Sequence, residues 1–273
     1  MIGRQNTGLT EEAVKALLKR YGIAQRDIEF EVDASTVHKV AAGPGPFVMD
    51  RSFINAFADC TVEAIDVSPY ERAEIVHDLS QPIPDTLTRQ FDFIYDGSSL
   101  DNIFDTTAAI KNYDRLLKPG GRMILMNWSN SLANAYSMLT PDWFMDFFSF
   151  NEYRDAKVYV VQMEPPHLSF WHYDPYVVQH GQTGYQISSI TSKEMRATIC
   201  VAEKGENDAK NASPVQQHYR GDDRDMYLAS AKRFHESPRP IMQLQHWGKT
   251  TAKPNISNRN AVYLIADSNT GKY

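Results

Sequence analysis

The stretch that decides the fold of this chain spans residues 91–127. It reads FDFIYDG (91–97), TTAAIKNYDRLL (106–117), KPGG (118–121) and RMILMN (122–127). The first and last segments are short, nearly continuous apolar runs, which are typical of strands buried on both faces. The second has apolar residues on one helical face, and the third ends that helix sharply. Strand, helix and strand in this order indicate a parallel pair joined by a helical crossover.

Similar elements are expected on both sides of this stretch. Further strands are expected at residues 62–67, 74–77, 157–162, 196–202 and 261–266, and further helices between Thr10 and Gly22, after Asp50, after Thr140 and at residues 226–234. Residues 165–185 and 204–225 have no such pattern and are expected to be irregular. Together these expectations give an α/β fold with a doubly wound, mostly parallel sheet in residues 1–204. Residues 205–273 are expected to be a C-terminal extension, serving as a lid, a dimer arm or a substrate element.

The composition is that of a globular protein with a full core. The chain has 273 residues, of which 42% are hydrophobic, and a formal net charge of -6. That charge argues against general binding to a nucleic acid backbone, and no apolar run approaches the roughly 18 residues that span a bilayer. Two cysteines, Cys60 and Cys200, are too few for a disulfide framework. We therefore expect a soluble, cytoplasmic protein that binds neither nucleic acid nor membrane.

Three acids follow successive predicted strands. Asp66, Asp78 and Asp96 each stand at or just after a strand end, and open parallel sheets bind ligands beyond the carboxyl ends of their strands. The first acid can accept hydrogen bonds from a ribose diol and the second from an adenine amino group. The third, with Gly97, would line the cleft of the reacting group. Each acid alone is equally typical of a turn.

Four segments, taken in order, resemble a known family. They are IGRQ (2–5), DVSPYERAEIVHDL (66–79), DGSSLDNIFD (96–105) and LTPDWF (139–144), and LLKPGGRMIL (116–125) lies among them. They resemble class I S-adenosylmethionine-dependent methyltransferases, and more closely a bacterial subgroup with a Leu-Gly-Arg-Gln opening and an Asp-Gly-Gly-Thr-Leu-Glu-His-like segment. The resemblance covers about residues 1–155. It implies a Rossmann-like methyltransferase fold with S-adenosyl-L-methionine as cofactor.

The resemblance also implies site residues. The expected cofactor-binding residues are Gly3, Arg4, Asp66, Val67, Asp78, Leu79, Asp96 and Ser98. The best local candidate for a catalytic base is Asp101, for which a helix-capping carboxylate is an equal alternative. The expected substrate-binding residues are Asn102, Asn134, Tyr136 and Trp171.

Two departures from the family pattern bear on catalysis. The usual Gly-x-Gly-x-Gly after the first strand is absent, and Gly3-Arg4-Gln5 stands in its place. One glycine lets the backbone approach a ligand less well than three do. Asn102 and Asn134 stand where the subgroup has histidines. If those histidines act as bases, proton transfer by them is lost, which affects turnover more than cofactor binding.

Aromatic residues gather after the last strand of the deciding stretch. We expect residues 136–148 and 165–185 to cover the cleft beyond Asp96 and to form an acceptor pocket, although aromatics at helical spacing are also typical of a core. His167, His172 and His180 share a loop region. Their spacing matches no metal-binding pair on a helix face, so no metal is expected.

Three functions fit these residues. The first is methyl transfer from S-adenosyl-L-methionine to a small-molecule acceptor, such as a sugar or glycan precursor. The second is a non-catalytic descendant that binds the cofactor or a partner protein, which the altered glycine loop and the missing histidines favour. The third is an NAD-dependent enzyme, which lacks the Gly-x-Gly-x-x-Gly loop that pyrophosphate requires. A homodimer is left open.

Overall fold

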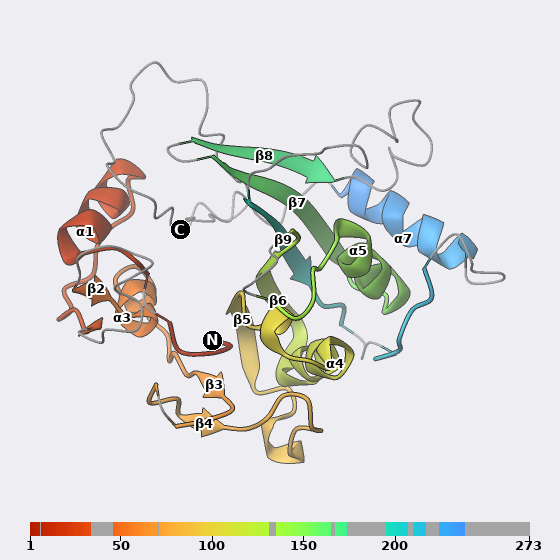
Figure 1. The fold of residues 1–273 in the computed structure, drawn as a ribbon, viewed down its shortest axis with the longest axis horizontal. Helices are drawn as coiled ribbons and strands as arrows, with labels where there is room; N and C mark the ends of the chain where they lie inside the picture. Colours follow the sequence, from red (N-terminus) through yellow and green to blue (C-terminus); the bar gives the residue numbers. More distant parts are fainter. Residues whose placement is uncertain are drawn as a thin grey trace. The chain divides into compact units, whose positions relative to one another are not determined.

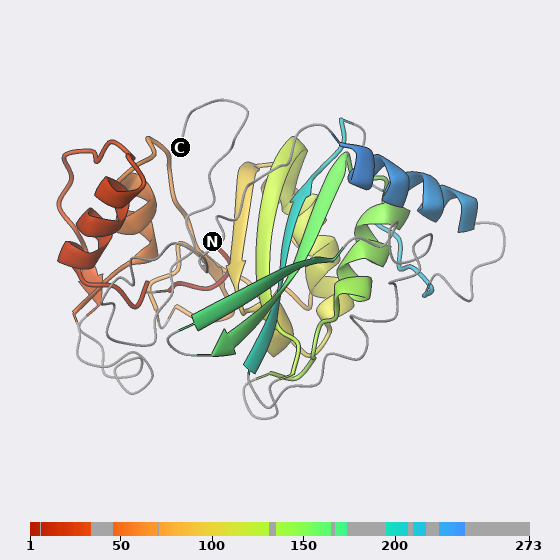
Figure 2. The same ribbon diagram turned by 90° about the horizontal axis from the view of Figure 1, so that it is seen from above.

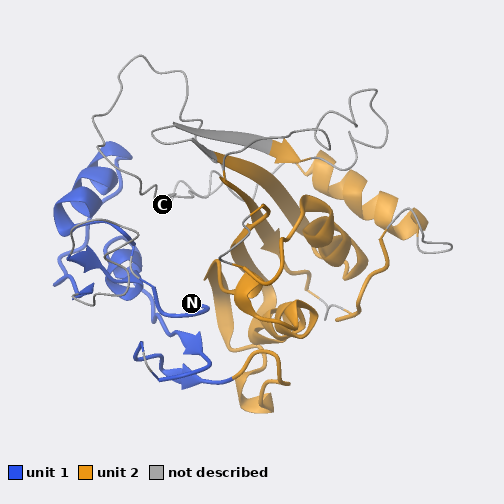
Figure 3. Ribbon diagram, viewed as in Figure 1, with its two compact units in different colours: residues 1–77, 242–245, 251–273 blue, residues 78–241, 246–250 orange. Residues whose placement is uncertain are grey.

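The computed structural model describes most of the chain (Figure 1; Figure 2). The described residues are 1–5, 7–33, 46–69, 71–130, 135–164, 167–173, 195–206, 210–216 and 224–237, without the side chains of residues 163–171. They form two compact units, divided between His77 and Asp78 (Figure 3). This division differs from the expected boundary at residues 204–205. The strand expected at residues 261–266 lies outside the described part.

The helices of unit 1 pack on each other and on a short strand pair. α1 (Glu11–Arg20) begins at Thr10, whose hydroxyl accepts a hydrogen bond from the Ala13 amide. It ends before Gly22, whose φ of 66° is the left-handed conformation that favours glycine after a helix. α3 spans Asp50–Asn55, and β1 (Val32–Asp33) pairs antiparallel with β2 (Phe47–Val48). The buried core residues of this part are Val14, Leu18, Ile23, Val48, Phe53 and Ala56.

Unit 1 also holds a short parallel ladder. β3 (Ile65–Asp66) pairs in parallel with β4 (Ile75–Val76), and Ile2 forms a parallel bridge to Ile65. The strands predicted at residues 62–67 and 74–77 thus exist, but each has two residues. A carboxylate oxygen of Glu74 accepts a hydrogen bond from the Ala64 amide at 2.7 Å. Because this side chain occupies the amide that a neighbouring strand would otherwise bond, the ladder ends there.

Unit 2 is built on a five-stranded mixed sheet. Its strands are β5 (Phe91–Gly97), β6 (Leu117–Trp128), β7 (Asp155–Glu164), β8 (His167–Tyr173) and β9 (Met195–Glu203), in the order β5-β6-β9-β7-β8. β5 and β6 are parallel, as residues 91–127 predict, and α4 (Thr106–Leu116) joins them. The other three neighbouring pairs are antiparallel.

The mostly parallel sheet is therefore not confirmed in unit 2. Two residues separate β7 from β8, and a parallel pair needs a crossover of a dozen or more residues, so these strands must be antiparallel. β8 also corrects the expectation that residues 165–185 are irregular throughout. β9 runs antiparallel to both neighbours and lies between β6 and β7.

The described helices of unit 2 all cover one face of its sheet (Figure 2). They are α4, α5 (Pro141–Phe150) and α7 (Arg224–Glu236), and α5 contacts both β7 and β9. α7 buries Tyr227, Ala231 and Phe234, one helical face, and packs on α5. This packing places residues 224–236 of the expected C-terminal extension in unit 2. Helices on both faces, as a doubly wound fold requires, are not described within this unit.

Two short 3₁₀ helices connect these elements, η1 (Asp85–Leu87) and η2 (Leu100–Asn102). The KPGG segment belongs to the start of β6 rather than to a separate turn. A Cβ on Gly121 would lie 2.8 Å from the Leu117 side chain, so the backbone approaches itself closely there. No helix among the described residues is long and apolar enough to cross a membrane.

Candidate functional site

The parallel pair β5–β6 brings two strand ends together at its carboxyl edge. Asp96 lies opposite Leu125 and Gly97 opposite Met126. Directly after β5, Ser98 has a φ of 80°. This conformation is uncommon for a residue with a Cβ, and strained residues of this kind cluster at ligand sites. The chain then enters η2, so the turn of residues 96–102 closes this edge.

The Asp96 carboxylate points into this turn. It has no exposed surface. Its oxygens accept hydrogen bonds from two backbone amides, those of Ser99 at 2.6 Å and Leu100 at 3.0 Å. They also accept hydrogen bonds from two side chains, the Tyr113 hydroxyl at 3.3 Å and the Asn127 amide group at 3.5 Å. Burial raises the pKa of Asp96 to about 6, against the hydrogen bonds from the two backbone amides. A ligand at this strand end would therefore meet backbone rather than the Asp96 carboxylate.

Asp101 is the second buried carboxylate of the turn. It also has no exposed surface. It accepts the Trp128 amide at 2.7 Å and the Ser98 hydroxyl at 3.0 Å, and its backbone oxygen accepts the Tyr136 amide at 2.8 Å. Burial raises the pKa of Asp101. These bonds join η2, the end of β6 and the following loop, as expected of a capping carboxylate. The role of Asp101 as a base stays a prediction.

Asn127 lies beside both carboxylates. Its side chain is fully buried, and its Oδ1 atom has no hydrogen-bond partner among the described residues. Sequence reasoning assigned Asn127 to a strand and gave it no role. The sequence did contain a signal for a structural role of Asn127, because a polar residue that ends a buried apolar strand needs hydrogen-bond partners inside the protein.

The expected cofactor residues of unit 1 lie around the β3 ladder. The Gly3 amide donates to the Ile65 carbonyl at 2.8 Å. The Arg4 side chain is 6% exposed and pairs with Asp50 at 2.9 Å and with Glu74. The Arg4 guanidinium is therefore turned into the unit. Asp50 acts in this cluster instead of capping α3, whose N-cap residue is Met49.

The three acids at strand ends are divided between the units. In unit 1, a carboxylate oxygen of Asp66 accepts the Ser68 amide at 3.0 Å, and the neighbouring Val67 is 69% exposed. In unit 2, Asp78 is exposed, with a carboxylate oxygen accepting the Ser80 amide at 2.9 Å, while Leu79 is buried. That all three acids meet at one edge, as a cofactor site requires, stays a prediction.

Aromatic side chains stand exposed beside the 96–102 turn. Tyr136 is 75% exposed and packs edge-to-face on Phe104, which is 86% exposed, with ring centroids 5.9 Å apart. Asn102 is exposed, and its side-chain amide donates to the Ser98 carbonyl at 2.8 Å. Asn134 and the side chain of Trp171 lie outside the described residues.

Metal binding has no support in the described part of the chain. No group of three or more histidine, cysteine or acidic side chains there could hold an ion. His172 lies in β8. The side chain of His167 and the whole of His180 fall outside the description.

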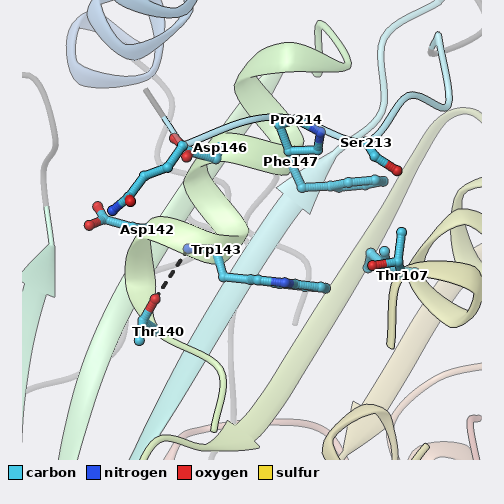
Figure 4. Close-up of a pocket in the computed structure, with 10 residues that line it drawn as sticks. Thr107, Thr140, Asp142, Trp143, Asp146, Phe147, Ser213 and Pro214 are labelled. Atoms are coloured by element: carbon cyan, nitrogen blue, oxygen red, sulfur yellow. Dashed lines mark hydrogen bonds between the residues drawn. The ribbon is translucent and has the colours of Figure 1, made fainter. Parts of the chain in front are cut away.

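A cavity of about 250 Å³ lies between α4, α5 and residues 213–216 (Figure 4). Ten residues line it, among them Asp142, Trp143, Asp146 and Phe147 of α5. Trp143 and Phe147 belong to the stretch of residues 136–148 that was expected to form an acceptor pocket, but the acidic lining and the contribution of residues 213–216 were not predicted. The acids were detectable, because Asp142 and Asp146 are one helical turn apart and share a face.

The comparisons with known proteins add little to this geometry. No protein-family model matches the chain, and no curated protein sequence matches it. Among solved structures, it is similar to phosphoethanolamine N-methyltransferase 2 of Haemonchus contortus in complex with S-adenosyl-L-methionine, with 14% identity and a TM-score of 0.33. The match covers 52% of this chain and 43% of that chain, so less than half of that enzyme is represented. At this TM-score we take neither fold nor function from it.

Proposed function

We propose that this protein transfers the methyl group of S-adenosyl-L-methionine to a small-molecule acceptor. The observation that carries the proposal is the 96–102 turn at the carboxyl edge of β5 and β6. Its carboxylates are turned inward, which leaves the backbone of Gly97 and Ser98 to meet a ligand where such sheets bind one. The four sequence segments that resemble methyltransferases include this turn.

The chain's groups suit an adenosyl cofactor. Asp66 is partly exposed and Asp78 exposed, so both carboxylates can accept hydrogen bonds from outside the chain, as ribose and adenine require. Gly3 has a φ of 67°, which lets the backbone come close to a ligand. In this proposal each acid acts as the resemblance implies: Asp66, with Val67, accepts from the ribose, and Asp78, with Leu79, meets the adenine.

The reaction asks for alignment and for exclusion of water more than for a strong base. When bound, the cofactor supplies an electrophilic methyl group on a sulfonium. An acceptor atom forms a bond to that carbon while the carbon–sulfur bond breaks, and the acceptor's proton leaves to solvent or to a nearby group. A site whose carboxylates are buried within a turn can support such a displacement if it orients the acceptor.

The acceptor would lie on the aromatic pair Phe104 and Tyr136. These rings are exposed next to the turn, and Asn102 presents a side chain beside them. Aromatic rings bury the flat face of a molecule, and amide groups fix its polar atoms. A sugar or glycan precursor has both a flat face and polar atoms, and we propose this class of molecule as the acceptor.

Non-catalytic binding is the second candidate, and the burial of Asp101 favours it. That carboxylate is saturated by the chain's own donors, so the one acid that the sequence offered as a base has no exposed surface. A descendant that keeps cofactor binding and loses turnover would have this arrangement.

Two measurements separate these candidates. Calorimetric titration with S-adenosylhomocysteine and with NADH tests the cofactor: heat with the first and none with the second supports the proposal, and the reverse contradicts it. A screen of sugars with S-adenosyl-L-methionine that carries a radiolabelled methyl group then tests turnover. Binding of S-adenosylhomocysteine with no labelled product from any acceptor would favour the non-catalytic protein.

A further inference from the structure

The first residues of unit 1 lie along β3, the strand that ends at Asp66. The Ile65 amide donates to the Met1 carbonyl at 3.0 Å, and the Gly3 amide donates to the Ile65 carbonyl at 2.8 Å. Gly3 is thus bonded to the residue that directly precedes Asp66. The Gly3 backbone and the Asp66 carboxylate, which the proposed function brings to the cofactor, are therefore placed by one pair of neighbouring segments.

The Arg4 side chain, next to Gly3, binds two carboxylates inside unit 1. Its Nη1 atom donates to Oδ1 of Asp50 at 2.9 Å, and its Nη2 atom donates to Glu74. The side chains of Arg4 and Asp50 are only 6% and 4% exposed. Two carboxylate partners fix the direction of the planar guanidinium. Arg4 cannot turn toward a ligand without leaving a buried carboxylate unpaired, which is strongly unfavourable.

Glu74 connects Arg4 to the beginning of both strands of the short ladder. Its Oε2 atom accepts hydrogen bonds from Arg4 and from the Ala64 amide, the latter at 2.7 Å, and its Oε1 atom accepts one from Arg51. Ala64 directly precedes β3, and Glu74 directly precedes β4. A single carboxylate therefore ties the residue after Gly3 to the start of the strand that ends at Asp66.

Asp50 holds the residue on the other side of Arg4. Its Oδ2 atom accepts the Gln5 amide at 3.0 Å, and its own amide donates to the Gln5 carbonyl at 2.9 Å. Gly3, with its left-handed φ of 67°, is thus bonded to β3, while Gln5 is bonded to the first residue of α3. Backbone that is fixed before a ligand arrives loses less entropy when the ligand binds.

We propose that Arg4 and Glu74 are positioning residues for the cofactor, which hold the Gly3 backbone against the strand that carries Asp66 and do not touch the cofactor themselves. This inference rests on the proposed function, and it replaces the direct cofactor contact that the sequence suggested for Arg4. Loss of either side chain should weaken cofactor binding from outside the site, because a binding group displaced by about 1 Å loses much of its contribution.

Calorimetric titration of the full chain with two probes separates positioning from direct contact. S-adenosylhomocysteine carries an amino-acid carboxylate that an arginine could bind, whereas methylthioadenosine keeps the adenosine and the thioether and lacks that carboxylate. Arg4→Ala should weaken the binding of both probes by about tenfold, since both contain the ribose that Asp66 would bind. A direct contact of Arg4 with the carboxylate would instead weaken S-adenosylhomocysteine alone.

Three further variants show whether Arg4 and Glu74 act together. Glu74→Gln keeps an acceptor for the Ala64 amide and removes the charge that Arg4 binds, so it should weaken both probes by about threefold or more. The Glu74 side chain is 30% exposed, so this variant should fold without difficulty. Arg4→Ala combined with Glu74→Gln should lose about as much affinity as Arg4→Ala alone. Arg4→Lys keeps the charge without the planar fork and should recover part of the affinity.

Two matched controls lie elsewhere in unit 1. Arg26 pairs with Asp59 and donates to the Asn55 and Ala58 carbonyls, so Arg26→Ala removes a comparable set of arginine contacts from the same unit. Leu18→Ala opens a cavity in its core and lowers its stability. Both controls should leave the affinity of each probe per folded molecule unchanged, and the thermal midpoint of every variant reports its folding.

Three outcomes would overturn the inference and leave the proposed function in place. They are unchanged affinity for both probes in Glu74→Gln and Arg4→Ala, a loss confined to S-adenosylhomocysteine, and an equal loss in the two control variants. The last would show that affinity follows the stability of unit 1 alone. No binding of either probe by the parent protein up to about 10 mM would contradict the proposed function, and this inference with it.

Discussion

Two pairs of aspartates in unit 2 differ in the element that carries them and in where their described partners lie. Asp96 and Asp101, in the turn after β5, accept backbone amides and hydroxyls from within that turn and from β6. Asp142 and Asp146, on the first turns of α5, line a cavity. The first pair uses its charge to hold the chain in an uncommon conformation. In the second pair, Asp142 accepts a hydrogen bond from the Tyr173 hydroxyl, which belongs to a distant strand, and Asp146 is 5% exposed.

The difference shows how to interpret an acid found at the end of a strand or the start of a helix. Position alone suggested that Asp96 and Asp101 bind a ligand or act in catalysis. Their bonds show that they organise the backbone from which a ligand site would be made. Donors that lie within about three residues in sequence, such as Ser98 and Ser99, mark an acid of this structural kind.

Among changes to these four aspartates, the largest expected effect is on stability, and it tests this division directly. Asp101→Ala leaves the Trp128 amide and the Ser98 hydroxyl without their acceptor in a buried place. We expect it to lower the free energy of unfolding by about 3 kcal/mol. Asp142→Asn keeps an acceptor for the Tyr173 hydroxyl and should stay within about 0.5 kcal/mol of the parent. Urea denaturation of both variants measures the contrast, and equal costs would contradict it.

The second expected effect is a pH dependence of stability that comes from Asp96. The pKa of Asp96 is about 6 in the folded protein against an ordinary value of 3.8. Between these values the folded state holds a proton that the unfolded state has lost. The contribution of Asp96 to the free energy of unfolding therefore falls as pH rises from about 4 to 6, by roughly 3 kcal/mol, and is level above.

Asp96→Asn isolates this contribution, because asparagine does not titrate there. The unfolding free energy of the parent minus that of the variant should therefore fall by roughly 3 kcal/mol as pH rises through this window. Denaturation at pH 4, 5, 6 and 7 measures it. The pKa of Asp101 is also raised, but its contribution is present in both proteins and largely cancels. A difference that stays constant with pH would show that the pKa of Asp96 is not raised in the folded protein.

The third prediction asks which kind of acid Asp66 is. It accepts one local amide, that of Ser68, and it is partly exposed, so it shares features of both pairs. If it holds a ribose, Asp66→Ala should weaken S-adenosylhomocysteine binding about tenfold, since hydrogen bonds to a charged acceptor contribute about 1.5–3 kcal/mol. Asp59→Ala, at an exposed site in unit 1, is the control. Unchanged affinity in a folded Asp66 variant would make Asp66 a turn residue only.

Much of the fold could be predicted because the signals were local. Thr10 and Thr140 cap their helices as expected, each accepting an amide three residues on, and the β5–α4–β6 unit follows the apolar periodicity. β8 was missed because its run of seven residues mixes histidines with aromatics. The alternation of Leu168 and Phe170 with His167 and Ser169 was available as a signal.

The remainder depended on partners that are distant in sequence. Ser213 and Pro214 line the cavity directly after Ala212, which is bonded to Asn151, 61 positions away in the sequence. Arg4 was expected at a ligand and pairs instead with Asp50 and Glu74, 46 and 70 positions away. Residue type and spacing identify such groups as functional candidates, but not whether the protein or a ligand satisfies them.

The smallest expected effect on stability separates two kinds of aromatic side chain in the same way. Tyr136 is 75% exposed beside the turn, whereas Phe144 is fully buried in α5. Phe144→Ala should cost roughly 3–5 kcal/mol of unfolding free energy because it opens a cavity in the core. Tyr136→Ala removes little buried area, and its unfolding free energy should stay within about 0.5 kcal/mol of the parent.

If Tyr136 orients an acceptor, its loss should nevertheless reduce methyl transfer per folded molecule and leave the affinity for S-adenosylhomocysteine nearly unchanged. Normal acceptor kinetics in the Tyr136 variant would remove the Phe104–Tyr136 pair from the proposed site and leave it as exposed surface.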